Sequence, residues 1–236
     1  MMRFKQIQLA IALMMNVGVI AQQSGNGDQK ILIRYATAHV GNGQKIENAL
    51  LAFQGDEITM LADGNNTRVN VLDYDSIIGA EGKHIYPGFI VMDSRLGLTE
   101  IGAVRATDDY RETGDINPNI RALPAFNAES KVVSTVRTNG VLMAQLAPVG
   151  GMLSGSSAVV HFNGSNWKEA EITEDGIYLN WPSRYGYQGW WAEPGSAKKN
   201  KKYADGQDAI QEFFAEAQVF ASDSIRSYRN LKLEAM

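Results

Sequence analysis

The sequence predicts an α/β fold in which a small β-rich portion precedes strands that alternate with helices. Residues 30–82 contain short apolar stretches separated by turn residues, a pattern typical of an antiparallel meander. Residues 87–146 contain two short apolar runs with a helix-start signal between them, which predicts a strand–helix–strand unit. After residue 208 the apolar residues recur with helical spacing.

The composition is that of an ordinary globular protein. The 236 residues are 44% hydrophobic and 20% charged, which is enough for one large or two small domains. The formal net charge of -4 and the pI near 5.4 predict no nucleic-acid partner and no attraction to an anionic membrane, because either would require a basic face. The absence of cysteine excludes disulfides and thiolate metal sites.

Residues 1–21 have the pattern of a secretory signal peptide. A short basic head is followed by an apolar stretch that ends at Ala21, where we expect cleavage. The stretch is shorter than the roughly 20 apolar residues that a membrane-spanning helix needs. We therefore expect an exported protein, periplasmic or secreted, with no membrane span after cleavage. The polar residues 22–29 predict a flexible leader.

The first folded portion, residues 30–86, reads as three strands joined by tight turns. Apolar and β-branched residues gather at 31–40, 46–53 and 57–62, and glycine-containing turns separate them. This spacing predicts a small antiparallel meander.

A candidate site follows the next apolar run. Residues 89–92, after Pro87 and Gly88, form a run short enough for a buried strand. Because successive strand residues point to opposite faces, Asp93 and Arg95 are expected to share one face at its end. We take both as candidate binding residues, and an ion pair between them is the structural alternative.

A helix and a second strand are expected after this site. Asn117 before Pro118 predicts a helix start, with the helix over residues 119–129. Residues 140–146 read as a second buried strand, and the Gly- and Ser-rich residues 147–157 read as a tight loop. That loop lacks the lysine of a phosphate-binding loop and the Gly-x-Ser-x-Gly pattern of a serine hydrolase, so neither chemistry is predicted.

Residues 158–202 look like an insertion. Its many aromatic residues could stack on a sugar or another planar ligand, but packing within the insertion is the favoured interpretation. The lysine-rich residues 198–202 predict a solvated linker. Beyond it, Ile210, Phe213 and Ala217 have the spacing of a helix with one buried face.

Residues 87–90, Pro-Gly-Phe-Ile, followed by Asp93 and Arg95, resemble the first barrel strand of the amidohydrolase superfamily. Members of that family run Pro-Gly-hydrophobic-hydrophobic-Asp-x-His-x-His, and the two histidines bind a catalytic divalent metal, typically zinc. In this chain Asp93 and Arg95 stand at the positions of those histidines. The departure puts the metal site in doubt.

Three further segments carry the same resemblance. Residues 48–58 and 79–88 look like the beginning and end of the β-sandwich that precedes the barrel, and residues 137–157 resemble the second strand and loop of imidazolonepropionase-like members. The resemblance implies a β-sandwich portion over residues 30–86 and an incomplete TIM (β/α)8 barrel over residues 87–236. A full barrel takes about 250 residues, so only its first strands and helices are expected.

The sequence predicts no catalytic residue and no metal ligand set. Its three histidines, His39, His84 and His161, do not have the spacing of a metal motif, and we expect them to be surface or hydrogen-bonded residues. Arg95 would place a permanent positive charge at the family's metal position. No cofactor is therefore expected in this chain.

Three hypotheses about function stay open. The resemblance implies an amidohydrolase-like protein that acts on non-peptide carbon–nitrogen bonds of amides or cyclic amides and is inactive as this chain alone. A C-terminal barrel fragment or a homo-oligomer would then complete it. The second hypothesis is an exported, non-catalytic module that binds a small molecule or a protein partner. The third is a degenerate truncated fragment, and whether the chain is an enzyme is left open.

Overall fold

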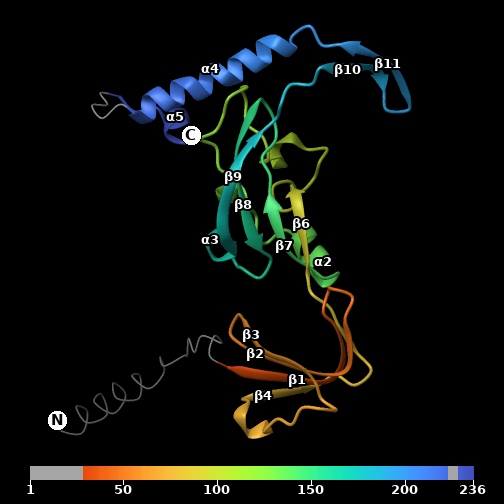
Figure 1. Cartoon of the computed structure of the whole chain (residues 1–236). Coiled ribbons are helices and arrows are strands. Elements are labelled where there is room, and N and C mark those ends of the chain that lie inside the picture. Colours follow the sequence, from red (N-terminus) through yellow and green to blue (C-terminus); the bar gives the residue numbers. More distant parts are fainter. Residues whose placement is uncertain (1–28, 223–227) are drawn as a thin grey trace, which may run out of the picture. The chain divides into compact units, whose positions relative to one another are not determined.

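The computed structural model describes residues 29–222 and 228–236, and the chain divides into two compact units between Pro87 and Gly88. Each unit is built on its own sheet (Figure 1). The predicted signal peptide, residues 1–21, and nearly all of the predicted leader lie outside the described residues. Within the described part, no helix combines the length and the apolar character that crossing a membrane requires.

The first unit contains one five-stranded sheet in the order β3-β2-β1-β4, with β5 also paired to β1. Its elements are β1 (Lys30–His39), β2 (Lys45–Gln54), β3 (Glu57–Asp63), the 3-10 turn η2 (Val71–Asp73), β4 (Ser76–Gly79) and β5 (His84–Ile85). The first three strands are antiparallel, as predicted, whereas β4 and β5 run parallel to β1. Leu32, Leu50 and Ala52 form the buried cluster of this sheet.

The second unit has a four-stranded sheet in the order β6-β7-β8-β9 and a separate β10–β11 hairpin. Its strands are β6 (Phe89–Ser94), β7 (Val141–Leu146), β8 (Leu153–His161), β9 (Glu171–Leu179), β10 (Tyr185–Trp190) and β11 (Glu193–Lys199). Its helices are η3 (Arg105–Thr107), η4 (Leu123–Ala125), α2 (Lys131–Thr138), α3 (Trp167–Ala170), α4 (Tyr203–Ser222) and α5 (Leu231–Glu234).

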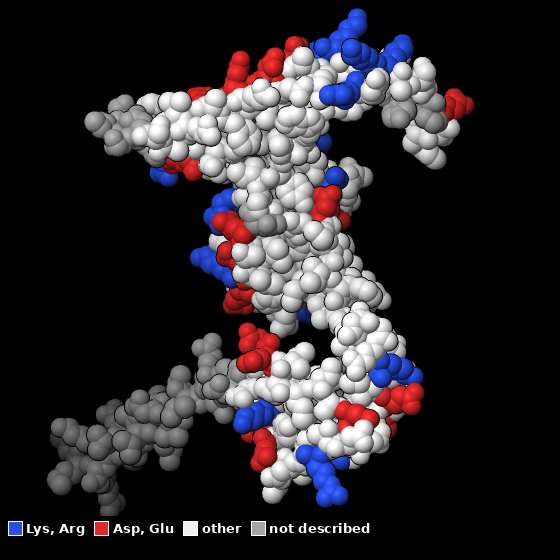
Figure 2. Space-filling view, in the orientation of Figure 1, with Lys and Arg blue, Asp and Glu red and all other residues white. Residues whose placement is uncertain are grey.

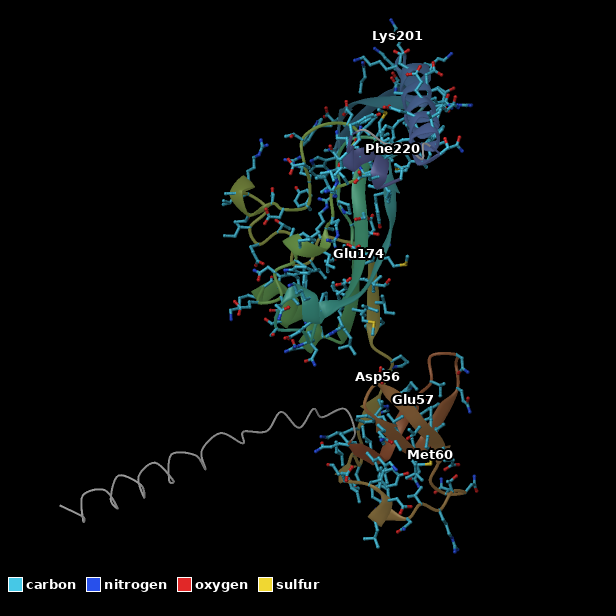
Figure 3. The ribbon with its side chains drawn as sticks, turned by 90° about the vertical axis from the view of Figure 1, so that its left-hand side faces the viewer. Asp56, Glu57, Met60, Glu174, Lys201 and Phe220 are labelled. Carbon is cyan, nitrogen blue, oxygen red and sulfur yellow. The ribbon has the colours of Figure 1, made fainter. Side chains whose placement is uncertain are left out.

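One face of this sheet carries the main core. The long connection of residues 95–130 and helix α2 lie on that face, on one side of the strands in Figure 3. The largest buried members of the core are Leu98, Leu123, Phe126, Val133, Leu146, Val160 and Phe162. Ser130 caps α2, because its hydroxyl accepts a hydrogen bond from the Val132 amide.

Helix α4 buries the apolar face that its sequence spacing predicts. Phe213, Ala217 and Phe220 recur every three or four residues and pack with Leu153 of β8 and Leu233 of α5. The helix begins at Tyr203, earlier than the predicted start near residue 208.

The prediction of an incomplete TIM barrel was wrong. A barrel of that kind needs parallel strands that are each followed by a helix. Among the described residues only β6, α2 and β7 form such a unit, and β8 and β9 return antiparallel in a mixed sheet. The reversal takes place at Gly150 and Gly151, whose φ angles of 109° and 66° favour glycine, so the chain pairs straight back onto β7. The predicted sandwich portion is likewise a single mixed sheet in the described residues.

The helix predicted over residues 119–129 was also wrong. The amide of Asn117 donates to a β8 carbonyl at 2.8 Å, and that of Ala122 donates to another at 3.0 Å, so this stretch is tied along β8. Backbone donors used in this way cannot build a helix. Within residues 119–129 the chain makes the short 3-10 turn η4, and the α-helix α2 starts after Ser130.

Candidate functional site

The end of β6 departs from regular strand geometry. Between Val91 and Ser94 the register against β7 shifts, and Asp93 has a φ of 51°, in the left-handed region. The Asp93 amide donates to Oε1 of Gln145 at 3.3 Å. Arg95 lies beyond the last residue of β6, so the strand alternation that predicted a shared face for Asp93 and Arg95 does not hold.

Asp93 and Arg95 nevertheless line the same hollow. Its volume is about 540 Å³, and its lining consists of Val91, Asp93, Ser94, Arg95, Leu96, Thr99, Glu100 and Val132. No ion pair between Asp93 and Arg95 is present in the described part of the chain. Both charged groups are exposed, so they are open to a ligand rather than occupied by each other.

The Arg95 guanidinium is placed by an aromatic ring. Its carbon lies 4.6 Å from the centre of the Tyr110 ring, and the Arg111 guanidinium lies 5.8 Å from the same centre. A cation over a ring face is attracted by the quadrupole of the ring. Tyr110 comes from the irregular connection of residues 95–130, where the sequence has no periodicity that could have pointed to it.

Glu100 adds a second carboxylate to the hollow. One of its oxygens accepts from Nδ2 of Asn127 and the other from the Ser130 hydroxyl, both at 3.0 Å. Because Ser130 also caps α2, the position of this carboxylate is coupled to the start of that helix. The hollow thus presents one guanidinium and two carboxylates beside the apolar side chains of Val91, Leu96 and Val132, an arrangement suited to a small molecule that carries charges of both signs.

A bare apolar surface lies beside this hollow. The prediction of a buried strand at residues 89–92 was wrong, because Phe89 is 66% exposed, Ile90 61% and Met92 74%. Leu142 of β7 is 45% exposed. We call these four residues the β6 surface. β6 is an edge strand, and the visible face of the second unit over β6 and β7 carries few charged side chains (Figure 2).

Comparison with known proteins gives a likeness in structure. No family model matches the chain, and no curated protein matches it in sequence. A solved amidohydrolase from Thermotoga maritima MSB8 matches with a TM-score of 0.67 and 17% identity over 87% of this chain. This chain has an amidohydrolase-like fold. The match covers 54% of the Thermotoga chain, so this chain corresponds to about half of that protein.

The described residues do not fit the zinc ion that an amidohydrolase-like fold suggests. Zinc is held by converging imidazoles, carboxylates or thiolates. No group of three or more such side chains comes together in the described part of the chain. At the hollow, the Arg95 guanidinium cannot act as a ligand and would repel a cation.

Two tryptophans of the predicted insertion pack against each other: the rings of Trp190 and Trp191 meet edge to face, with centres 5.5 Å apart. Trp181 is 51% exposed, Trp190 58% and Trp191 89%, so these three side chains are also largely open to solvent. Lysines gather at the base of the β10–β11 hairpin and the start of α4, where Figure 2 shows a blue cluster and Figure 3 labels Lys201.

Proposed function

We propose that this chain is one component of an amidohydrolase-like hydrolase that acts on non-peptide carbon–nitrogen bonds of amides or cyclic amides. A second polypeptide, which corresponds to the part of the Thermotoga structure that this chain does not cover, supplies the catalytic residues and their metal. The first 21 residues support export, so the complex would form in the periplasm or outside the cell.

The β6 surface carries this proposal. Monomeric proteins rarely leave large apolar side chains side by side on an unpaired edge strand, because such an edge templates pairing with other chains. Phe89, Ile90 and Met92 are consecutive or alternate residues of that strand, and all are more than half exposed. A second chain that adds to this edge would pair its free backbone groups and cover its side chains.

Co-expression tests the proposal. The chain is produced together with polypeptides of its host that match the uncovered part of the amidohydrolase structure, and the complex is purified and supplied with Zn²⁺. We expect a stable complex that hydrolyses members of a panel of amides and cyclic amides, with activity lost on chelation. A pure, zinc-loaded complex that hydrolyses none of them would refute the proposed activity.

The hollow supports a second candidate function, a binding module for a zwitterionic small molecule such as an amino acid. Arg95 would take the carboxylate of the ligand, and Asp93 and Glu100 would take its ammonium group. Calorimetric titration with a panel of amino acids tests this, with Asp93→Ala and Arg95→Ala expected to abolish binding. The matched control is Arg105→Ala, an exposed arginine outside the hollow. Absence of binding by the folded wild-type chain would exclude this function.

A further inference from the structure

The parallel pairing of β1 and β5 brings two histidines together in the first unit. Thr37 stands opposite His84 and Ala38 opposite Ile85, so the end of β1 lies beside the start of β5. His39 is the last residue of β1, and its side chain reaches diagonally across to His84. The two residues are 45 positions apart in the sequence, so no local motif could have revealed the pair.

The two rings are joined by a hydrogen bond between ring nitrogens. Nε2 of His39 lies 3.0 Å from Nδ1 of His84, and the ring centres are 5.2 Å apart. Tyr86 stacks on His39, with ring centres 4.2 Å apart and planes inclined by 11°. The stack restrains the His39 ring, while His84 and Tyr86 are exposed and leave the site open to solvent.

We propose that His39 and His84 form a binding site for a late first-row divalent metal ion, Cu²⁺ or Ni²⁺. Imidazole nitrogens suit these ions, and each ring presents one nitrogen to the shared point. Half-buried His39 and exposed His84 leave the other coordination positions to water. The site lies in the first unit and is independent of the proposed hydrolase function.

The nitrogen separation in the hydrogen-bonded pair is close to the bite of a tetragonal ion, and the ion replaces that hydrogen bond when it binds. With metal–nitrogen bonds of about 2.0–2.1 Å, two nitrogens 3.0 Å apart subtend an angle of about 95° at the metal. That angle is close to the roughly 90° of square-planar or tetragonal Cu²⁺ and Ni²⁺ and below the roughly 109° of tetrahedral Zn²⁺. The two rings must turn for both lone pairs to meet at one ion, and the broad χ2 torsion of histidine permits that rotation.

The lysine that stands opposite His39 is paired with a carboxylate. Lys45 stands opposite His39 in β2, and its ammonium pairs with the Glu47 carboxylate at 3.0 Å. The ammonium is therefore neutralised locally rather than directed at the histidines. The Thr37 hydroxyl is hydrogen-bonded to the Glu47 carbonyl and adds no charge.

Metal titration of the full chain, produced without a histidine tag, tests the site. Calorimetry with NiCl2 is expected to show one binding event, and electron paramagnetic resonance with CuCl2 is expected to show two coordinated nitrogens. Loss of a residue that only orients a metal ligand lowers the affinity for the metal about 10–100-fold. Loss of a ligand should cost at least as much, so His39→Ala or His84→Ala should weaken Ni²⁺ binding at least about tenfold. The control His161→Ala removes a histidine whose ring accepts from the Asn163 amide, and it should bind like wild type.

A variant that preserves the stack keeps the test interpretable. His39→Phe retains an aromatic ring against Tyr86 but removes the ligating nitrogen and its hydrogen bond to His84, so it should lose the metal while the metal-free protein still folds. Ni²⁺ should raise the unfolding midpoint of wild type and of His161→Ala only. Equal Ni²⁺ binding by wild type and His39→Phe, or no binding by the folded wild type, would overturn the proposal.

Discussion

The β6 surface makes a quantitative prediction about association. Ile90 and Met92 are 61% and 74% exposed and lie two residues apart, so both point to the same side of the edge strand. Replacing both by lysine puts two charges where a partner chain would have to bury them. Both side chains face solvent in the isolated chain, so the unfolding midpoint of the double variant should differ little from that of the wild type.

The magnitude follows from the exposed fractions. Full burial of an Ile or Met side chain is worth about 1.5–3 kcal/mol, so the area still exposed on Ile90 and Met92 represents about 2–4 kcal/mol together. Loss of that contribution raises the dissociation constant of a complex formed through the β6 surface about 30- to 1,000-fold. Burying the new ammonium groups would add to the loss.

Sedimentation velocity of the pure chain over a range of concentrations measures the effect. In the absence of its partner the wild-type edge should pair with further copies, and Ile90→Lys/Met92→Lys should remain monomeric. The matched control is Leu72→Lys/Val219→Lys, which changes two residues that are 87% and 69% exposed elsewhere. Equal loss of association in both double variants, or a wild-type chain that stays monomeric at every concentration, would refute the reasoning.

Three further predictions concern stability and titration. Asp93→Gly should stabilise the chain by about 1 kcal/mol in urea unfolding, because glycine accepts the φ of 51°, whereas Asp93→Val should destabilise it. Leu146→Ala, at a fully buried core position, should cost about 2–5 kcal/mol in the same assay. The hydrogen bond from the Ser165 side chain lowers the pKa of Glu169, so Ser165→Ala should raise that pKa in a carbon-13 NMR titration. The stabilisation of the folded chain by this hydrogen bond is therefore present above the ordinary pKa of glutamate. It is lost as the pH falls through the lowered pKa of Glu169.

The first three strands could be predicted because their signals are local. Gly41, Gly43 and Gly55 have positive φ angles in the two turns, and the apolar residues between them fill short strands. Strands β4 and β5 were missed, because each pairs with β1 across more than forty residues of chain. A strand that depends on such a distant partner leaves a weak local pattern.

In the candidate site, too, the residues with a local sequence signal could be predicted and those placed by long-range contacts could not. Asp93 and Arg95 could be singled out because they end an apolar run, and both do line one hollow. Their neighbours Tyr110 and Glu100 belong to the connection of residues 95–130, which is fixed by scattered hydrogen bonds rather than by a repeating pattern. Its long-range contacts therefore decide the shape of the hollow, and those contacts could not be derived from spacing.

The failure to predict exposure at residues 89–92 is itself informative. A run of four apolar residues indicates a strand meant for burial, and the sheet of the second unit gives this strand only one neighbour. The backbone of β6 is formed, yet Phe89, Ile90 and Met92 stay in contact with water. The apolar pattern and the bare edge agree if a further segment of polypeptide covers this strand, as proposed above. The mismatch between sequence and structure at β6 is thus the physical reason to expect a partner there.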